Sequence, residues 1–315
     1  MRVLITGADG FVGRHLVRRL LDQGLLGGRT VSRLVLMDIA FNEHIVDPRV
    51  QLICGSIAEA GLLDEAFAEG PLDFVFHLAS IPGGLAEARF GLGLEVNLNA
   101  TVALLELLRQ QMQAARLVFA STIAVYGAPM PAEVGDDTPL RPGLSYAAHK
   151  RVGEVLIEDY SRRGWIEGVS LRLPGIVARP PEPSGLLSAF MSDVFWQLKA
   201  GAPFTCPVSP EAVAWWMSVS CCVENLLHAA TVPAEALVAR RSLALPVLHL
   251  TMAEVIGALA RRFGDDRHEL VSYRPDAQLE AGFGAFPPLR AEAAKTLGFV
   301  HDGDVDRLIE RAINP

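Results

Sequence analysis

The chain has 315 residues, of which 50% are hydrophobic and 20% are charged. This composition excludes a disordered or fibrous protein and is typical of one large or two modest globular domains. Its formal net charge of −8 argues against nucleic acid as the main partner, because binding to phosphates needs a basic surface.

Short apolar runs alternate with amphipathic stretches through the first half of the chain. Six runs are predicted to be strands: RVLITG (2–7), RLVLMD (33–38), VQLIC (50–54), DFVFHLAS (73–80), RLVFAST (116–122) and VSLRLP (169–174). Because most are apolar throughout, they resemble strands that are buried on both faces of a parallel sheet. Their alternation with helices predicts an α/β fold with a doubly wound parallel (Rossmann) sheet.

After about residue 179 this alternation ends. A Pro-rich segment, ARPPEPSG (178–185), and a loop-like stretch (203–212) precede a strand–helix unit at 246–264. A further strand is expected at ELVSYRP, and helices are expected near 290–297 and 303–313. We therefore predict a Rossmann domain at 1–178 and a smaller, partly discontinuous substrate-binding region at 179–315, with 240–264 returning to the Rossmann sheet.

The first predicted strand ends in TGADGFVG (6–13), which has glycines at Gly7, Gly10 and Gly13 and opens a helix. Glycine allows a tight turn, a close approach of backbone to a diphosphate, and close packing of helix on strand. The diphosphate would then lie at a helix N-terminus, where free N–H groups face it. The context predicts a dinucleotide site, and the alternative is a purely structural turn.

The second predicted strand ends at Asp38, about the expected distance beyond the glycines. An acid there can accept both hydroxyls of an adenosine ribose and would repel a 2′-phosphate. No Arg or Lys follows in DIAFNEH, so NAD is favoured over NADP. The alternative is an aspartate that caps a turn.

A tyrosine and a lysine lie four residues apart in YAAHK (146–150). This spacing places both side chains on one helix face, and a surface turn is the simplest explanation for an isolated pair. The fifth predicted strand ends at FASTIAVYG (119–127), which brings Ser121 and Thr122 to the carboxyl edge of the sheet, where ligands bind.

The glycine loop, Asp38, the hydroxyl at strand 5 and YxxxK together resemble the extended short-chain dehydrogenase/reductase family, also called the NAD-dependent epimerase/dehydratase family. The resemblance implies that Thr122, Tyr146 and Lys150 are catalytic. A free phenol titrates near 10, and a nearby ammonium and nicotinamide favour its phenolate form. It also implies NAD contacts at Gly7, Gly10, Phe11, Val12, Gly13, Asp38, Ser56, Ile57, Leu78, Ala79, Ser80, Asn97, Tyr146, Lys150, Pro174, Ile176 and Val177. Ser56 stands where many members have an Asp that contacts adenine.

Four segments are similar to one subgroup of the family, the NAD-dependent dehydrogenases of four-carbon sugar acids such as D-erythronate. They are 83–101, 171–185, 206–219 and 240–259. The similarity implies oxidation of the 2-hydroxyl of a small sugar acid, with substrate contacts at Ser80, Ser121, Thr122, Tyr146 and Arg179. Arg179 is the candidate for the substrate carboxylate, and its alternative is a surface ion pair with Glu182. The bulky stretch AVAWWMSVSCC (212–222) predicts either a small closed pocket or plain core packing by Trp215 and Trp216.

Two other functions stay open at this point. One is a nucleotide-sugar epimerase or 4,6-dehydratase with tightly bound NAD, although 180–239 contains Lys199 as its one Lys or Arg, and a sugar diphosphate normally binds arginines. The other is a catalytically silent NAD-binding protein.

Composition also predicts where the chain works and with what partners. The N-terminus has no signal-peptide pattern, and no apolar run approaches the roughly 20 residues of a membrane span. Cys54, Cys206, Cys221 and Cys222 have no metal-binding spacing. We expect a cytoplasmic protein with buried, reduced thiols, no metal, and a homodimer formed through helices at 95–113 and 145–163.

Overall fold

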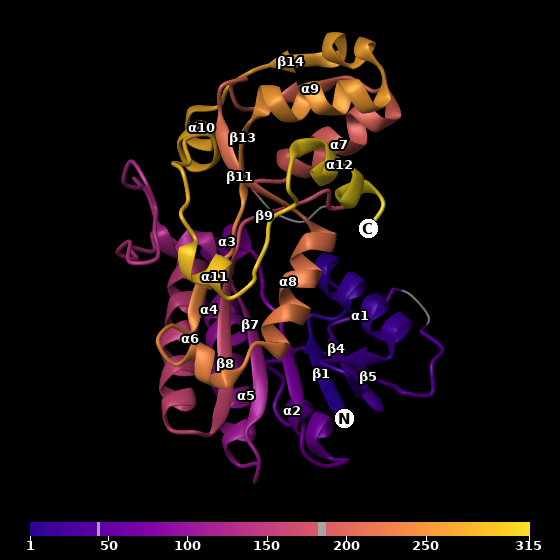
Figure 1. The fold of residues 1–315 in the computed structure, drawn as a ribbon, viewed down its shortest axis with the longest axis vertical. Helices are drawn as coiled ribbons and strands as arrows, with labels where there is room; N and C mark the ends of the chain where they lie inside the picture. The colour runs from indigo at the N-terminus through magenta and orange to yellow at the C-terminus, as the bar shows by residue number, and fades with distance from the viewer. Residues whose placement is uncertain (43–44, 182–186) are drawn as a thin grey trace. The chain divides into compact units, whose positions relative to one another are not determined.

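A seven-stranded sheet forms the centre of the first of two units in the computed structural model, which describes residues 1–42, 45–181 and 187–315 (Figure 1). The strand order is β5-β4-β1-β6-β7-β8-β12, and the pairings of β1, β4, β5 and β6 are parallel. The strands are β1 (Arg2–Thr6), β4 (Arg33–Asp38), β5 (Val50–Cys54), β6 (Phe74–His77), β7 (Ala115–Thr122), β8 (Ile166–Leu173) and β12 (Ser242–Ala244). The predicted Rossmann sheet is therefore confirmed.

The helices of this unit follow the amphipathic stretches of the sequence. They are α1 (Phe11–Gln23), α2 (Leu62–Phe67), α3 (Gly83–Ala88), α4 (Phe90–Leu94), α5 (Ala100–Arg109), α6 (Ser145–Arg162) and the larger part of α8 (Val219–Thr231), with a short hairpin of β2 (Leu25–Leu26) and β3 (Arg29–Thr30). Helices α2, α5 and α6 share one core with alternate strand residues such as Leu4, Val35 and Leu117. The intervening strand residues are buried as well, so the sheet is covered on both faces.

The strand order reverses beside β1, which lies between β4 and β6. In an open α/β sheet, ligands bind outside the carboxyl ends of the strands at such a reversal. Because β1 and β6 are parallel neighbours, Gly7 and Leu78, which follow these two strands, leave the sheet at the same edge. Asp38 and Thr122 end β4 and β7 at that edge.

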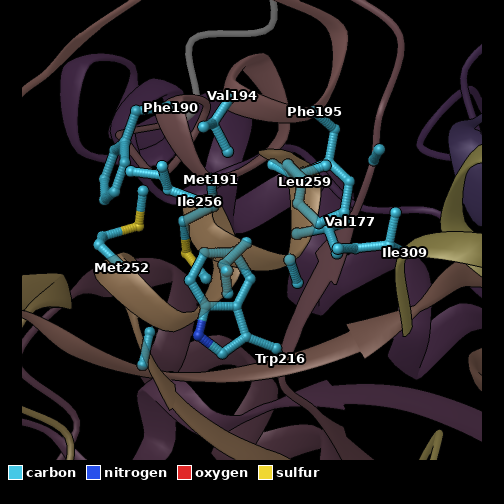
Figure 2. Packing of buried hydrophobic residues seen from close by; sticks show 14 of the residues in the cluster. Val177, Phe190, Met191, Val194, Phe195, Trp216, Met252, Ile256, Leu259 and Ile309 are labelled. Carbon is cyan, nitrogen blue, oxygen red and sulfur yellow. The ribbon is translucent and has the colours of Figure 1, made fainter. Parts of the chain in front are cut away.

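The second unit contains two small sheets and a helical layer. Its strands are β9 (Gly175–Val177), β11 (Val213–Ser218) and β13 (Leu248–Thr251) in one sheet and β10 (Phe204–Cys206) and β14 (Val271–Tyr273) in the other; its helices are α7 (Phe190–Ala200), α9 (Met252–Phe263), α10 (Ala277–Phe283), α11 (Glu292–Thr296) and α12 (Val305–Ile313). Helix α9 begins at a capping box, in which Thr251 and Glu254 each accept from the other's backbone N–H. Its apolar face, with Ile256 and Leu259, joins the core around Trp216 (Figure 2).

Trp215 and Trp216 are both fully buried. Their indole N–H groups donate to carbonyl oxygens, at Pro287 (2.7 Å) for Trp215 and at Leu250 (3.0 Å) for Trp216. Of the two sequence interpretations of this stretch, the structure supports core packing.

The boundaries of the two units differ from the predicted ones. The first unit comprises residues 1–125, 142–172 and 223–244, and the second comprises 126–141, 173–222 and 245–315. Only Ser242–Ala244 of the segment 240–264 joins the Rossmann sheet, by pairing with β8. β13 pairs antiparallel with β11 instead, and α9 packs on α7 and α12. The second half of the Pro-rich segment 178–185 lies outside the described residues.

The four cysteines are free thiols, but they are not all buried. Cys206, Cys221 and Cys222 are buried, whereas Cys54 is exposed. Cys54 ends β5, the edge strand of the sheet, where alternate side chains face outward. The expectation of a buried thiol was wrong at this position.

Candidate active site

The chain turns sharply between β1 and α1, and this turn requires glycine. Gly7 has a φ of +72°, and a Cβ there would lie 2.7 Å from the backbone nitrogen of Ala79. A Cβ at Gly13 would lie 2.1 Å from the carbonyl oxygen of Gly7. Helix α1 begins after Gly10 with no hydrogen bond from a capping side chain among the described residues, and the first N–H groups of a helix point outward, where they can bind an anion. The turn therefore fits a dinucleotide diphosphate.

Asp38 ends the neighbouring strand β4 with its carboxylate already oriented. The backbone N–H of Asp9 donates to Oδ2 (2.8 Å) and that of Ile39 donates to Oδ1 (2.7 Å). Burial raises the pKa of this half-buried carboxyl, and the backbone hydrogen bonds oppose that rise. Each oxygen can still accept a further hydrogen bond, as recognition of two ribose hydroxyls requires.

Two other predicted cofactor residues, Ser56 and Ile57, follow β5. The Ser56 hydroxyl accepts from the N–H of Ala58 (3.2 Å), and Ile57 is buried. In the first turn of α1, Phe11 is buried and Val12 is half-buried. These residues stay predictions as NAD contacts.

Asn97 secures the segment that follows β6. It lies in a π-helical turn (Glu95–Asn99) between α4 and α5, whereas the sequence predicted a regular helix. Its side-chain oxygen accepts from Ser80 Oγ (3.0 Å) and from the N–H of Ile81 (2.8 Å), and its amide donates to the carbonyl of Ile81 (3.2 Å). Asn97 thereby fixes the path of residues 78–81, and π-turns occur frequently at functional sites.

A buried chain of hydrogen bonds, which the sequence did not reveal, lies beneath this segment. His77 Nδ1 is 2.7 Å from Thr6 Oγ1, and His77 Nε2 is 2.9 Å from Thr101 Oγ1. Since the Thr101 hydroxyl donates to the carbonyl of Asn97 (3.1 Å), it accepts from His77, which places the imidazole proton on Nε2. Burial, followed by the nearby Lys150 charge, lowers the pKa of His77 to about 3, so the ring is neutral.

Tyr146 and Lys150 lie on successive turns of α6, as predicted. Lys150 is 1% exposed, with its Nζ 4.6 Å from the centroid of the Phe119 ring and 5.9 Å from that of Tyr146. No carboxylate of the described residues forms an ion pair with it, and burial lowers its pKa to about 7. Tyr146 is half-buried. This side of the sheet thus contains a buried amine without a counter-charge.

Thr122 ends β7 and is 9% exposed. Its Oγ1 accepts from the N–H of Ala124 (3.1 Å), and its hydroxyl hydrogen meets no acceptor within the described ranges. The hydroxyl can therefore donate to a ligand. Ser121 differs, because it is buried and donates to the carboxylate of Glu154 (2.6 Å).

The remaining predicted residues lie in the second unit. Pro174 and Val177 are buried, Ile176 and Arg179 are half-buried, and the carbonyl of Arg179 accepts from the indole N–H of Trp196 (2.6 Å). Glu182, the alternative partner of Arg179, lies outside the described residues. The roles of these residues stay predictions.

Sequence reasoning missed Glu154 and Arg172, which form a buried ion pair (2.9 Å) between α6 and β8. One signal was present in the sequence. Glu154 follows Lys150 by four residues, as Lys150 follows Tyr146, so all three share one side of α6.

Comparison with known proteins identifies the family of the chain. The profile of the NAD dependent epimerase/dehydratase family matches residues 3–239. D-erythronate dehydrogenase of Cupriavidus necator is 40% identical over 98% of this chain and 97% of that protein, and that of Haemophilus influenzae is 32% identical over 99% of both. The crystal structure described as a nucleoside-diphosphate-sugar epimerase from Agrobacterium tumefaciens superimposes with a TM-score of 0.91 at 33% identity, covering 98% of this chain and 92% of that one. With a glycine turn and a strand-end acid that suit NAD, the chain belongs to the NAD dependent epimerase/dehydratase family and is an NAD-dependent oxidoreductase.

Proposed function

We propose that the protein oxidises the 2-hydroxyl of a small sugar acid, D-erythronate or a close relative, with NAD as the oxidant. The observation that carries this proposal is the full-length similarity to two proteins named D-erythronate dehydrogenase. The site supports it, because a strand-end hydroxyl, a tyrosine and a buried lysine lie at the edge where the cofactor turn also opens.

In this proposal Tyr146 takes the proton of the substrate hydroxyl. Lys150 and its positive charge favour the phenolate of Tyr146, since an ammonium in a poorly solvated place attracts a nearby anion strongly. Thr122 donates its free hydroxyl hydrogen to the substrate oxygen and holds that oxygen near Tyr146. NAD, when bound, accepts the hydride from the substrate carbon.

The proposed NAD contacts divide between the two sides of the cofactor. The first turn of α1 and Gly7 would bind the diphosphate, and Asp38 would bind the adenosine ribose. Lys150 would donate to the hydroxyls of the other ribose, which explains an amine buried without a carboxylate. Asn97 would hold residues 78–81 against the cofactor.

A nucleotide-sugar epimerase is the second candidate, because the similar Agrobacterium structure carries that description. The one Lys or Arg in 180–239, Lys199, counts against it, as a sugar diphosphate needs more cations. A silent NAD-binding protein would have no reason to retain Thr122, Tyr146 and Lys150 together.

One experiment separates the three. The purified protein is incubated with NAD and, in turn, with four-carbon sugar acids and with UDP- or dTDP-sugars, and free NADH and converted sugar are followed. We expect NADH to accumulate with a sugar acid. Conversion of a nucleotide sugar without net NADH would support the epimerase instead, and bound NAD without any turnover would support the silent protein. Tyr146→Phe should abolish turnover and leave NAD binding within about twofold.

We also propose that the protein is a homodimer formed through α4, α5 and α6. The helical stretch Phe90–Arg109 is long and apolar enough by composition to cross a membrane, which by itself is weak evidence for a membrane span. Of its most apolar 18 residues, 44% are buried inside the protein. Phe90, Val102, Val152 and Val155 are exposed apolar side chains on these contacting helices. Light scattering should give a dimer, and Val152→Glu with Val155→Glu should give a monomer.

A further inference from the structure

Glu154 is a fully buried carboxylate that neither substrate nor cofactor is proposed to touch. Four donors converge on it: Ser121 Oγ (2.6 Å), Arg172 Nε and Nη2 (both 2.9 Å), and Arg151 Nη1 (3.0 Å). Arg172 is itself 5% exposed. A buried carboxylate with a bidentate guanidinium and a hydroxyl donor is held in one orientation.

These contacts join three elements at the edge of the sheet where the candidate site lies. Glu154 is on α6, two turns after Tyr146 and one turn after Lys150, while Arg172 is near the end of β8. Ser121 is the residue before Thr122 at the end of β7. Ser121 and Thr122 are adjacent at the strand end, so the bond from Ser121 to Glu154 anchors the residue that immediately precedes Thr122.

The bond from Ser121 therefore fixes the peptide that carries Thr122. Beyond Thr122 the chain enters a 3₁₀ turn (Ile123–Tyr126) and leaves the first unit. β7 ends at Thr122, and the Glu154 cluster links this strand end to α6 through side chains.

We propose that Glu154 is a positioning residue, which holds the strand end carrying Thr122 in register with Tyr146 and Lys150. The inference rests on the proposed catalytic roles of those three residues. In this proposal Ser121 does not contact the substrate, and its role is to bind Glu154. Since a misplacement of about 1 Å at a reacting group can lower a rate about 100-fold, loosening this link should slow the chemical step more than binding.

Two variants and one matched control test the proposal. Ser121→Ala removes only the link to β7, and Glu154→Gln weakens the whole cluster. Glu167→Gln is the control, because Arg116 and Glu167 also join β7 to β8 (3.1 Å) but at the opposite, amino ends of the same strands. We expect kcat to fall about tenfold for Ser121→Ala and about 100-fold for Glu154→Gln, with KM for NAD within about twofold, and to stay unchanged in Glu167→Gln.

The pH profile separates positioning from a direct effect of charge. If Glu154 acts by geometry, kcat of both variants falls by a constant factor at every pH, because Tyr146 and Lys150 still titrate as before. A shift of the profile in Glu154→Gln, or an equal loss of kcat in the control, would overturn the proposal. Ser121→Thr, which keeps the hydroxyl, should recover most of the rate.

A measurement without substrate distinguishes failure of this inference from failure of the proposed function. Amide hydrogen exchange in a peptide covering 115–126 should quicken in Ser121→Ala and Glu154→Gln and not in the control. If the wild-type protein oxidises no sugar acid yet shows this pattern, the proposed substrate is wrong and the positioning role stands. If the wild type is active and neither variant changes kcat or exchange, the positioning role is refuted.

Discussion

Lys150 should lower the free energy of unfolding of the protein. Its amine is buried without a counter-charge, and burial lowers its pKa from 10.5 to about 7. In the unfolded chain the amine is protonated below 10.5, whereas the folded protein resists protonation until about 7. The folded state therefore has its full stability above pH 10.5 and loses it as the pH falls towards 7.

The size of the loss follows from the two values of the pKa. Each unit of pKa corresponds to about 1.4 kcal/mol, so the difference amounts to roughly 4 kcal/mol at pH 7. Lys150→Met removes the charge and keeps an unbranched apolar side chain of similar length. The variant without cofactor should therefore be more stable than wild type at pH 7, with its Tm raised by roughly 10 °C, while turnover is lost.

Thermal unfolding of the apoprotein between pH 7 and 10 is the assay. The gap in Tm between Lys150→Met and wild type should narrow as the pH rises, and saturating NAD should narrow it at pH 7, because bound cofactor stabilises wild type more. Lys199→Met is the control, since Lys199 is exposed and should change Tm little. A variant that unfolds at or below the wild-type temperature, or a gap that ignores pH, would refute the reasoning.

Three further predictions concern the cofactor side. Burial lowers the pKa of His77 from 6.5 in the unfolded chain to about 3 in the folded protein. The free energy of unfolding should therefore fall as the pH falls from 6.5 towards 3, by about 2 kcal/mol at pH 5. In urea unfolding, the stability of His77→Gln should depend less on pH than that of wild type, and parallel pH dependences of the two proteins would contradict this. Gly13→Ala places a Cβ 2.1 Å from a carbonyl oxygen. It should lower the free energy of unfolding by about 3 kcal/mol and weaken NAD binding measured by calorimetry. In the control Gly91→Ala the new Cβ meets nothing within 4 Å, so stability and NAD binding should stay close to those of wild type. Asp38→Asn should reduce the preference for NAD over NADP in calorimetric titrations, and an unchanged ratio would show that another residue selects the cofactor.

The sheet could be predicted because its strands are nearly continuous apolar runs that end at glycine or a polar residue. β12 was harder to place, since three residues, Ser242–Ala244, give no periodicity. The predicted return of 240–264 to the Rossmann sheet holds only for β12, and its remainder differs for another reason. β13 and α9 have the strand and helix patterns of a Rossmann unit, and only the pairing of β13 with β11 assigns them to the second unit.

The candidate site was predictable to a similar extent. Gly7, Asp38 and Lys150 could be proposed from the sequence because each lies at a fixed distance from a strand or from another motif residue. His77 and Thr101 were not, because their hydrogen bond joins residues 24 positions apart and neither side chain is unusual in its own segment. The π-turn at Asn97 was not predicted either, because it covers only Glu95–Asn99 within a stretch that is helical on both sides.

Glu154 and Lys150 are buried one turn apart on α6, and they differ in whether protein groups balance their charges. Glu154 has four donors from Ser121, Arg172 and Arg151, so its charge is satisfied within the protein. Lys150, equally buried, has an aromatic ring 4.6 Å away and no carboxylate among the described residues. Lys150 is not among the four donors to Glu154. Burial of an amine that has no counter-charge lowers the stability of the fold at that position. In the proposed mechanism, contacts from the Tyr146 phenolate and from ribose hydroxyls of the cofactor would offset that loss.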